Sequence, residues 1–222
     1  MTTFNADHKM VGRVEGKATI QELEKEVGMY SATPEFCLRY GGPIARNILT
    51  TVPKEYYDEA RRRGQYPNID VRIHRLYPGN YPAYPGWHCD AQYRETYFGQ
   101  PRPNHTALSD HLICTVATES GISNTEFIAK EVAIDLACNE ADANYWANVD
   151  VAMQEQDVQT WLMPDGDLTR FDCWTLHRCQ PAQKRGWRLF FRMAMWYRPN
   201  LGEGQLSKQE MIYMDLQRPT GW

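Results

Sequence analysis

Three side chains in the sequence could bind one metal ion. His88 and Asp90 are separated only by Cys89 in the segment Trp87-His-Cys-Asp90. If this segment is extended, alternation places His88 and Asp90 on one face and turns Cys89 away. His177 follows 87 residues after Asp90, which leaves room for several strands between them. Two histidines and one carboxylate form a ligand set that suits Fe(II) and leaves coordination positions open for substrates.

A second group is a pair of arginines in an apolar setting. The segment 187–197 is nearly all apolar and is typical of a strand that is buried on both faces. Alternation places Arg188 and Arg192 on the same face of that strand. A buried guanidinium needs an anionic partner, either a protein carboxylate or a dicarboxylate ligand held bidentately. For Arg192, the candidate partners are Asp167, Asp172 and the substrate.

The rest of the sequence indicates helices first and many short strands afterwards. The form Thr19-x-x-Glu22 is a capping box that predicts a helix over 20–29, and Pro53 and Gly64 bracket a second helix. Alternating or apolar runs predict the strands, and a polar segment between them is expected to be a helix or a long excursion. The strands are expected at 69–77, 112–118, 125–134, 158–163, 168–171, 174–179 and 187–197, and the polar segment at 141–156. This order predicts an α+β fold with a barrel or sandwich of strands.

These motifs, taken together, resemble the Fe(II)/2-oxoglutarate-dependent oxygenase superfamily, in its prolyl-hydroxylase-like or taurine-dioxygenase-like branch. The similarity extends over residues 69 to 197. It consists of the HxD motif at His88, the distal His177, Arg188 at 11 positions beyond it, and the lead-in Leu76-Tyr-Pro-Gly-Asn80. The resemblance implies a double-stranded β-helix, which is a jelly-roll or cupin-like barrel, buttressed by N-terminal helices.

The resemblance also implies roles for individual residues and for three cofactors. Fe(II), 2-oxoglutarate and O2 would hydroxylate a substrate C–H bond and release succinate and CO2. The residues implied are His88, Asp90 and His177 as catalytic metal ligands, Arg188 and Tyr77 at the 2-oxoglutarate, and Arg192 at an acidic group of the substrate. Trp87 belongs to the aromatic residues flanking the motif and is expected to contact the substrate.

Length and composition bound the remaining expectations. The 222 residues suffice for one domain, with a mainly helical part at 1–66, a jelly-roll core at 67–198 and a C-terminal tail or helix at 199–222. A net charge of −4 argues against binding to duplex nucleic acid. The sequence has no apolar run long enough for a membrane span and no secretory signal, and its six cysteines are scattered. A cytoplasmic location with reduced thiols is therefore expected.

Two other functions stay open at this stage. A cupin-like hydrolase or isomerase could use the same His/Asp/His site with another metal and no 2-oxoglutarate, although Arg188 would then have no role. A jelly-roll binding module could also retain the residues without catalysis. The substrate is expected to be a small molecule or a peptide side chain, and an amino acid or a nucleotide would fit. Apolar residues after Pro199 would suit a homodimer, but the sequence does not decide the oligomeric state.

Overall fold

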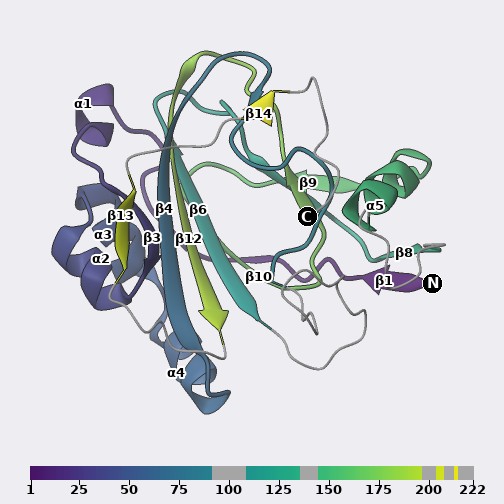
Figure 1. The fold of residues 1–222 in the computed structure, drawn as a ribbon, viewed down its shortest axis with the longest axis horizontal. Helices are drawn as coiled ribbons and strands as arrows, with labels where there is room; N and C mark the ends of the chain where they lie inside the picture. The colour runs from purple at the N-terminus through teal and green to yellow at the C-terminus, as the bar shows by residue number, and fades with distance from the viewer. Residues whose placement is uncertain (92–108, 136–144, 197–203, 208–212, 215–222) are drawn as a thin grey trace.

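Antiparallel strands make up most of the computed structural model of the protein (Figure 1). It describes residues 1–91, 109–135, 145–196, 204–207 and 213–214. The helices are α1 (Ile20–Leu23), α2 (Pro34–Tyr40), α3 (Pro43–Thr51), α4 (Lys54–Arg62) and α5 (Tyr145–Gln154). None of the helices in these ranges is long and apolar enough to cross a membrane.

The strands form two main sheets and two short ribbons. Their bounds are β1 (Thr2–Phe4), β2 (Lys9–Arg13), β3 (Gly28–Ala32), β4 (Tyr66–Leu76), β5 (Asn80–Tyr81), β6 (Asp110–Ala117), β7 (Thr125–Ile128), β8 (Val132–Ile134), β9 (Thr160–Leu162), β10 (Asp167–Asp172), β11 (His177–Cys179), β12 (Gly186–Trp196), β13 (Gln205–Ser207) and β14 (Tyr213–Met214). The large sheet has the order β13-β3-β4-β12-β6-β10-β2, and the small sheet has the order β11-β7-β9. The ribbons are β1-β8 and β14-β5.

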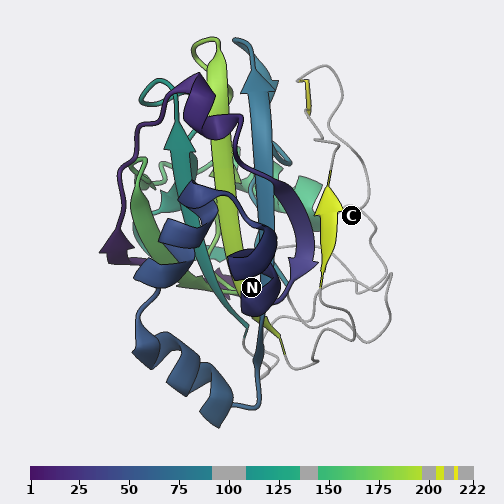
Figure 2. The same ribbon diagram turned by 90° about the vertical axis from the view of Figure 1, so that its left-hand side faces the viewer.

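The central strand β12 separates two chemically different layers. Helices α1 to α4 cover one face of the large sheet (Figures 1 and 2). Leu189, Phe191 and Met193 of β12 are fully buried in the core beneath these helices. The alternate residue Phe190 packs on the opposite face, in a cluster with Phe127 of the small sheet. The predicted strand that is buried on both faces is therefore confirmed.

A further core lies on the outer side of the small sheet. Helix α5 packs there, and its Trp146 and Val149 are buried with Leu176 and Ile128. Of the helix or long excursion expected at 141–156, the structure has a helix over Tyr145–Gln154, whereas residues 141–144 lie outside the described part of the chain. The space between the two sheets is left for His88, Asp90, His177 and the even-numbered positions of β12.

The N-terminal third is less helical than expected. The capping box of Thr19 and Glu22 forms as predicted, but α1 ends at Leu23 instead of continuing to Met29. Met29 belongs to β3, which pairs with β4, while β2 pairs with β10 at the other edge of the large sheet. Both strands take their hydrogen bonds from partners distant in sequence, so local periodicity does not reveal them. The second predicted helix is confirmed as α4.

The C-terminal segment was expected to be a tail or a helix. In its described residues it contributes strands: β13 pairs with β3, and β14 pairs with β5. The strands predicted at 125–134 and 174–179 are also shorter than expected. The former is divided into β7 and β8, and the latter begins only at His177.

Glu26 fastens the helical layer to the sheet. Its carboxylate accepts hydrogen bonds from the backbone N–H groups of Ile44 and Ala45 in the first turn of α3, at 2.6 and 3.2 Å. Gly42 is needed beside it, because an added Cβ would collide with the Glu26 carboxyl group. Glu26 thereby caps a helix whose own N-cap residue offers no side-chain acceptor.

We therefore expect Glu26→Ala to destabilise the protein. The substitution leaves two helix N–H groups without an acceptor and should lower the free energy of unfolding by about 1 to 3 kcal/mol. Urea denaturation followed by circular dichroism measures this value. The control is Glu24→Ala, because Glu24 is exposed on the same segment. Equal unfolding free energies for the two variants would show that the cap contributes no stability.

Candidate metal centre

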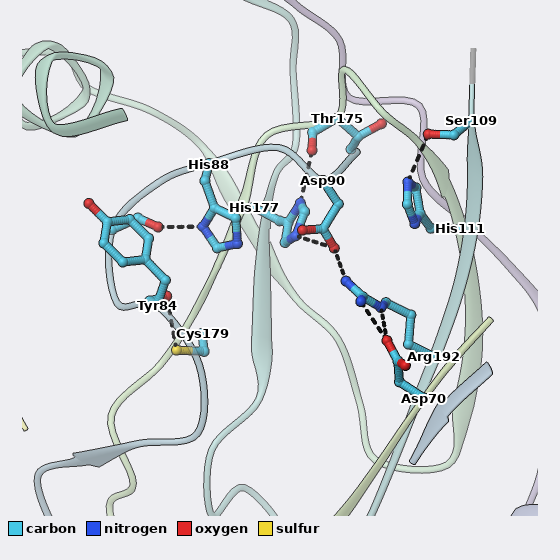
Figure 3. A network of polar contacts seen from close by, with 11 residues as sticks. Asp70, Tyr84, His88, Asp90, Ser109, His111, Thr175, His177, Cys179 and Arg192 are labelled. Atoms are coloured by element: carbon cyan, nitrogen blue, oxygen red, sulfur yellow. Dashed lines mark hydrogen bonds and ion pairs between the residues drawn. The ribbon is translucent and has the colours of Figure 1, made fainter. Parts of the chain in front are cut away.

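A direct backbone pairing joins His88 to His177. The N–H of each residue donates to the carbonyl of the other, at 3.0 and 2.9 Å, in an antiparallel bridge. This bridge adds the segment around His88 to the edge of the small sheet beside β11. Residues paired directly across strands project their side chains to the same face. The two imidazole rings accordingly lie 4.8 Å apart between centroids (Figure 3).

Both imidazoles are oriented by backbone carbonyls. Nδ1 of His88 lies 2.8 Å from the carbonyl oxygen of Gly86, and Nδ1 of His177 lies 3.0 Å from that of Thr175. A carbonyl oxygen can only accept, so each Nδ1 carries the proton and each Nε2 presents a lone pair. Burial and the neighbouring His88 ring lower the pKa of His177 to about 4. His177 is thus neutral near pH 7, and both rings present Nε2 to the same side, where it can bind a metal.

Asp90 completes the cluster on the same face. One ligand atom from each of His88, Asp90 and His177 lies within 4.8 Å of the other two. Burial by itself would raise the pKa of Asp90, but Arg192 and then the nearby imidazoles hold it well below its usual range. The group is therefore a carboxylate, and the cluster offers two nitrogen ligands and one anionic oxygen.

Arg192 links the carboxylate of Asp90 to a second buried acid, Asp70. Its Nη1 donates to Asp90 at 3.1 Å, and its Nε and Nη2 donate to Asp70 at 3.2 and 2.6 Å (Figure 3). The other oxygen of Asp70 accepts from the backbone N–H of Ser31 at 2.9 Å. This chain of charge-assisted bonds fixes Asp90 from the side away from the imidazoles.

The partners of Arg192 differ from those considered for the sequence. Asp167 pairs with Arg13 instead, and Asp172 accepts from Asn5. Asp70 was not predicted, although the alternation of the 69–77 segment places it on the polar face of that strand. Arg192 already donates hydrogen bonds to Asp70 and Asp90. The structure therefore gives no support to the expected role of Arg192 at an acidic group of the substrate.

Arg188 is the second cation on the inner face of β12, and its surroundings are different. It is 2% exposed, and no carboxylate of the described residues lies within ion-pair distance of it. Its Nε has no hydrogen-bond partner. Burial lowers the pKa of Arg188 to about 10. A buried charged group is destabilising unless an anion lies beside it, and the described residues supply none within ion-pair distance of Arg188.

An apolar wall lies beside these polar groups. Phe127 and Phe171 pack against the His177 ring, with centroids 5.5 and 4.9 Å away. His111 stacks on Phe171 at 5.1 Å, and its Nε2 lies 3.1 Å from the hydroxyl oxygen of Ser109. These rings limit the access of water to one side of the cluster, which strengthens the charge interactions within it.

Two residues expected at the site lie elsewhere. Tyr77 is 43% exposed, and its ring lies against the guanidinium groups of Arg75 and Arg185. Trp87 is 3% exposed and packs in the core under α5, with Arg178 over its ring. The structure therefore gives no support to either expectation. Alternation explains Trp87, because its neighbour His88 faces inward and Trp87 must face outward.

Three further histidines lie near the space between the sheets. His8 stacks on Phe127 and Trp161, with ring centroids 5.0 and 4.7 Å away. His111 lies beside the cluster, as described above. His74 of β4 is directly opposite Arg188 of β12 in the register. Alternation along the strand places His74 on the same face as Asp70. The position of His74 opposite Arg188 depends on the register between β4 and β12, which the sequence does not show.

No protein-family model and no curated protein matches the sequence. Among solved structures, it resembles AviO1 from Streptomyces viridochromogenes Tue57, with 10% identity, a TM-score of 0.44 and coverage of 86% of this chain and 90% of that one. The non-heme alpha-ketoglutarate-dependent carbocyclase SnoK from nogalamycin biosynthesis aligns with 15% identity, a TM-score of 0.42 and coverage of 86% and 73%. CytC3 with Fe(II) and alpha-ketoglutarate aligns with 11% identity, a TM-score of 0.34 and coverage of 87% and 81%. At these values the likenesses do not assign a function, which has to be inferred from the site.

Proposed function

We propose that this protein is an Fe(II)- and 2-oxoglutarate-dependent oxygenase that hydroxylates a C–H bond of a small or medium-sized substrate. The observation that carries the proposal is Arg188, a buried cation without a carboxylate partner on the strand that also supports Asp90 through Arg192. A metal site alone would fit several enzyme classes. A metal site with an unpaired buried cation nearby calls for a ligand that has a metal-binding end and an anionic end.

The donor set fits Fe(II). Two imidazole Nε2 atoms and one carboxylate oxygen on a single face form the arrangement found in non-heme Fe(II) oxygenases, which leaves positions for a chelating cosubstrate and O2. The carbonyls of Gly86 and Thr175 orient the imidazoles, and Arg192 orients the carboxylate. Such supporting bonds fix the ligands before the metal arrives.

Arg188 fits the distal carboxylate of 2-oxoglutarate. It lies four residues from Arg192 on β12, a distance of about 13 Å along a strand. The 2-oxo acid end of the ligand would therefore lie at the metal beside Arg192, and its distal carboxylate would lie near Arg188, further along the same strand. A guanidinium can hold a carboxylate with two parallel hydrogen bonds, which also sets its orientation.

The strand order supports the double-stranded β-helix. Setting aside the ribbon strands β5 and β8, the chain from β4 to β12 supplies eight strand segments, counting the one at His88. The first, third, sixth and eighth belong to the large sheet, in the order β4-β12-β6-β10. The others belong to the small sheet, in the order His88 segment, β11, β7 and β9. Eight antiparallel strands divided between two facing sheets are the arrangement of a jelly roll.

When Fe(II), 2-oxoglutarate and O2 are bound, oxidative decarboxylation of the 2-oxo acid supplies the oxidising power for the substrate C–H bond and leaves succinate and CO2. The residues of this chain bind and orient: Arg188 holds one end of the cosubstrate, and Arg192 keeps Asp90 ionised and in place. Phe127, Phe171 and their neighbours keep water away. An acidic substrate is no longer part of the proposal, since it depended on a free Arg192.

The central test is the metal site itself. We expect the anaerobic protein to bind Fe(II), to develop the visible charge-transfer band of an Fe(II)–2-oxo acid chelate, and to form succinate when O2 is admitted. His177→Ala should raise the Kd for Fe(II) by at least about 100-fold, because one of three ligands is lost. Calorimetry and the absorption band measure both effects.

Cys89→Ala is the matched control for His177→Ala. Cys89 lies between the two ligands of the HxD motif but is buried in the outer core, so its replacement should leave Fe(II) binding unchanged. Tight binding of Zn²⁺ without any effect of 2-oxoglutarate would contradict the proposal and favour the hydrolase or isomerase alternative.

For Arg188 we expect opposite effects on binding and stability. Arg188→Met should raise the Kd for 2-oxoglutarate by about 100-fold or more, because the anion loses its charged partner. The same variant should be at least as stable as the wild type without ligand, since an unpaired buried charge has been removed. Calorimetric titration and urea denaturation provide the two measurements. Arg178→Gln is the control, because Arg178 already pairs with Glu126 at 2.6 Å.

Asp70→Asn should weaken metal binding without affecting the cosubstrate. When Asp70 loses its charge, Arg192 interacts more strongly with Asp90, and the Asp90 carboxylate becomes a weaker ligand for the metal. We therefore expect the Kd for Fe(II) to rise about 10-fold. The Kd for 2-oxoglutarate of the metal-loaded variant should stay within twofold of the wild-type value. Asp167→Asn, a buried acid paired with Arg13, is the comparison. If both variants weaken metal binding equally, the effect reflects general destabilisation.

A further inference from the structure

His74 is a buried imidazole without a hydrogen bond. It lies on the inner face of β4 and is 1% exposed. Neither Nδ1 nor Nε2 has a partner among the described residues. A buried polar group without a partner is destabilising, so two such atoms on one ring indicate either a stability defect or a ligand that is absent from the structure.

The position of His74 favours a ligand. It is the direct cross-strand neighbour of Arg188, whose Nε is also buried and unpartnered. Two unpartnered side chains therefore lie next to each other on the same inner face. Burial, followed by Arg188 and Arg72, lowers the pKa of His74 to about 3, so the ring is neutral near pH 7. A neutral imidazole has one N–H to donate, and a carboxylate is the group that can accept from both His74 and Arg188.

An apolar cluster closes the sheet beyond this pair. Leu76 follows His74 on the same face of β4, and Ala117 is the register neighbour of Arg188 on β6. With Ile122 and Ala182 they form a separate, fully buried group. A ligand carboxylate bound at His74 and Arg188 could not lie further from the metal cluster, because only apolar side chains follow there. The fold therefore sets the distance between the carboxylate and the metal cluster.

We propose that His74 is a specificity-determining residue that donates a second hydrogen bond to the carboxylate held by Arg188 and selects a 2-oxo dicarboxylate over a 2-oxo monocarboxylate. The proposal rests on the proposed function, because it assigns His74 to the distal end of the same cosubstrate. His74 would be a neutral hydrogen-bond donor beside the charged guanidinium of Arg188. The apolar cluster beyond these two residues would limit the length of the ligand.

The test compares two ligands that differ only at the distal end. Kd values for 2-oxoglutarate and for 2-oxovalerate, which has five carbons but no distal carboxylate, are measured by anaerobic calorimetry on the Fe(II)-loaded protein. His74→Leu should raise the Kd for 2-oxoglutarate about 10-fold and leave that for 2-oxovalerate within twofold. In the Arg188→Met background the same substitution should change neither value. His74→Gln, which keeps a neutral donor, should recover part of the affinity.

Ile73→Val controls for disturbance of β4. Ile73 is the adjacent residue on the outer face, packed against the helical layer, and its variant should bind both ligands as the wild type does. Equal weakening of both ligands by His74→Leu, or no change in either, would overturn the role of His74 while leaving the proposed function intact. If the wild-type protein binds Fe(II) but not 2-oxoglutarate, the proposed function is wrong and the inference is overturned with it.

Discussion

The reciprocal backbone hydrogen bonds between His88 and His177 are the constraint on which the site depends. They bring together two segments that are distant in sequence and fix both imidazoles on one face of the small sheet. Asp90 reaches the same face because it is two residues further along. A shift of one residue in this pairing would turn either imidazole into the outer core, so the register of one short bridge decides whether a metal site exists.

The inner face of β12 carries the second constraint, which is charge balance away from water. Arg192 is compensated twice, by Asp70 and by Asp90, and its bonds to both hold the carboxylate of Asp90 in the candidate metal site. Arg188, four residues away, has no such compensation and is next to a histidine that also has no partner. On the inner face of the large sheet, the polar groups around Arg192 are therefore paired, whereas Arg188 Nε and both ring nitrogens of His74 have no partner among the described residues. This contrast separates Arg192, which supports Asp90, from Arg188 and His74, which we propose bind the cosubstrate.

Much of this arrangement was readable from alternation. The period of two in the 187–197 segment predicted a strand buried on both faces and placed Arg188 and Arg192 together, as the structure has them. The same rule paired His88 with Asp90 across Cys89. Applied to Trp87, it would also have excluded that residue from the site. The N-terminal strands β2 and β3 had no such signal, because their partners β10 and β4 are distant in sequence.

The sequence by itself determined which side chains could do chemistry and which neighbours share a face, because alternation along a strand is a local property of the backbone. Tertiary structure decided which of those faces meet. It gave Arg192 to Asp70 and Asp90, placed Tyr77 among exposed arginines, and set His74 opposite Arg188. Pairing between strands is fixed by register over long separations in sequence and by burial of the apolar faces. No local pattern specifies these two quantities.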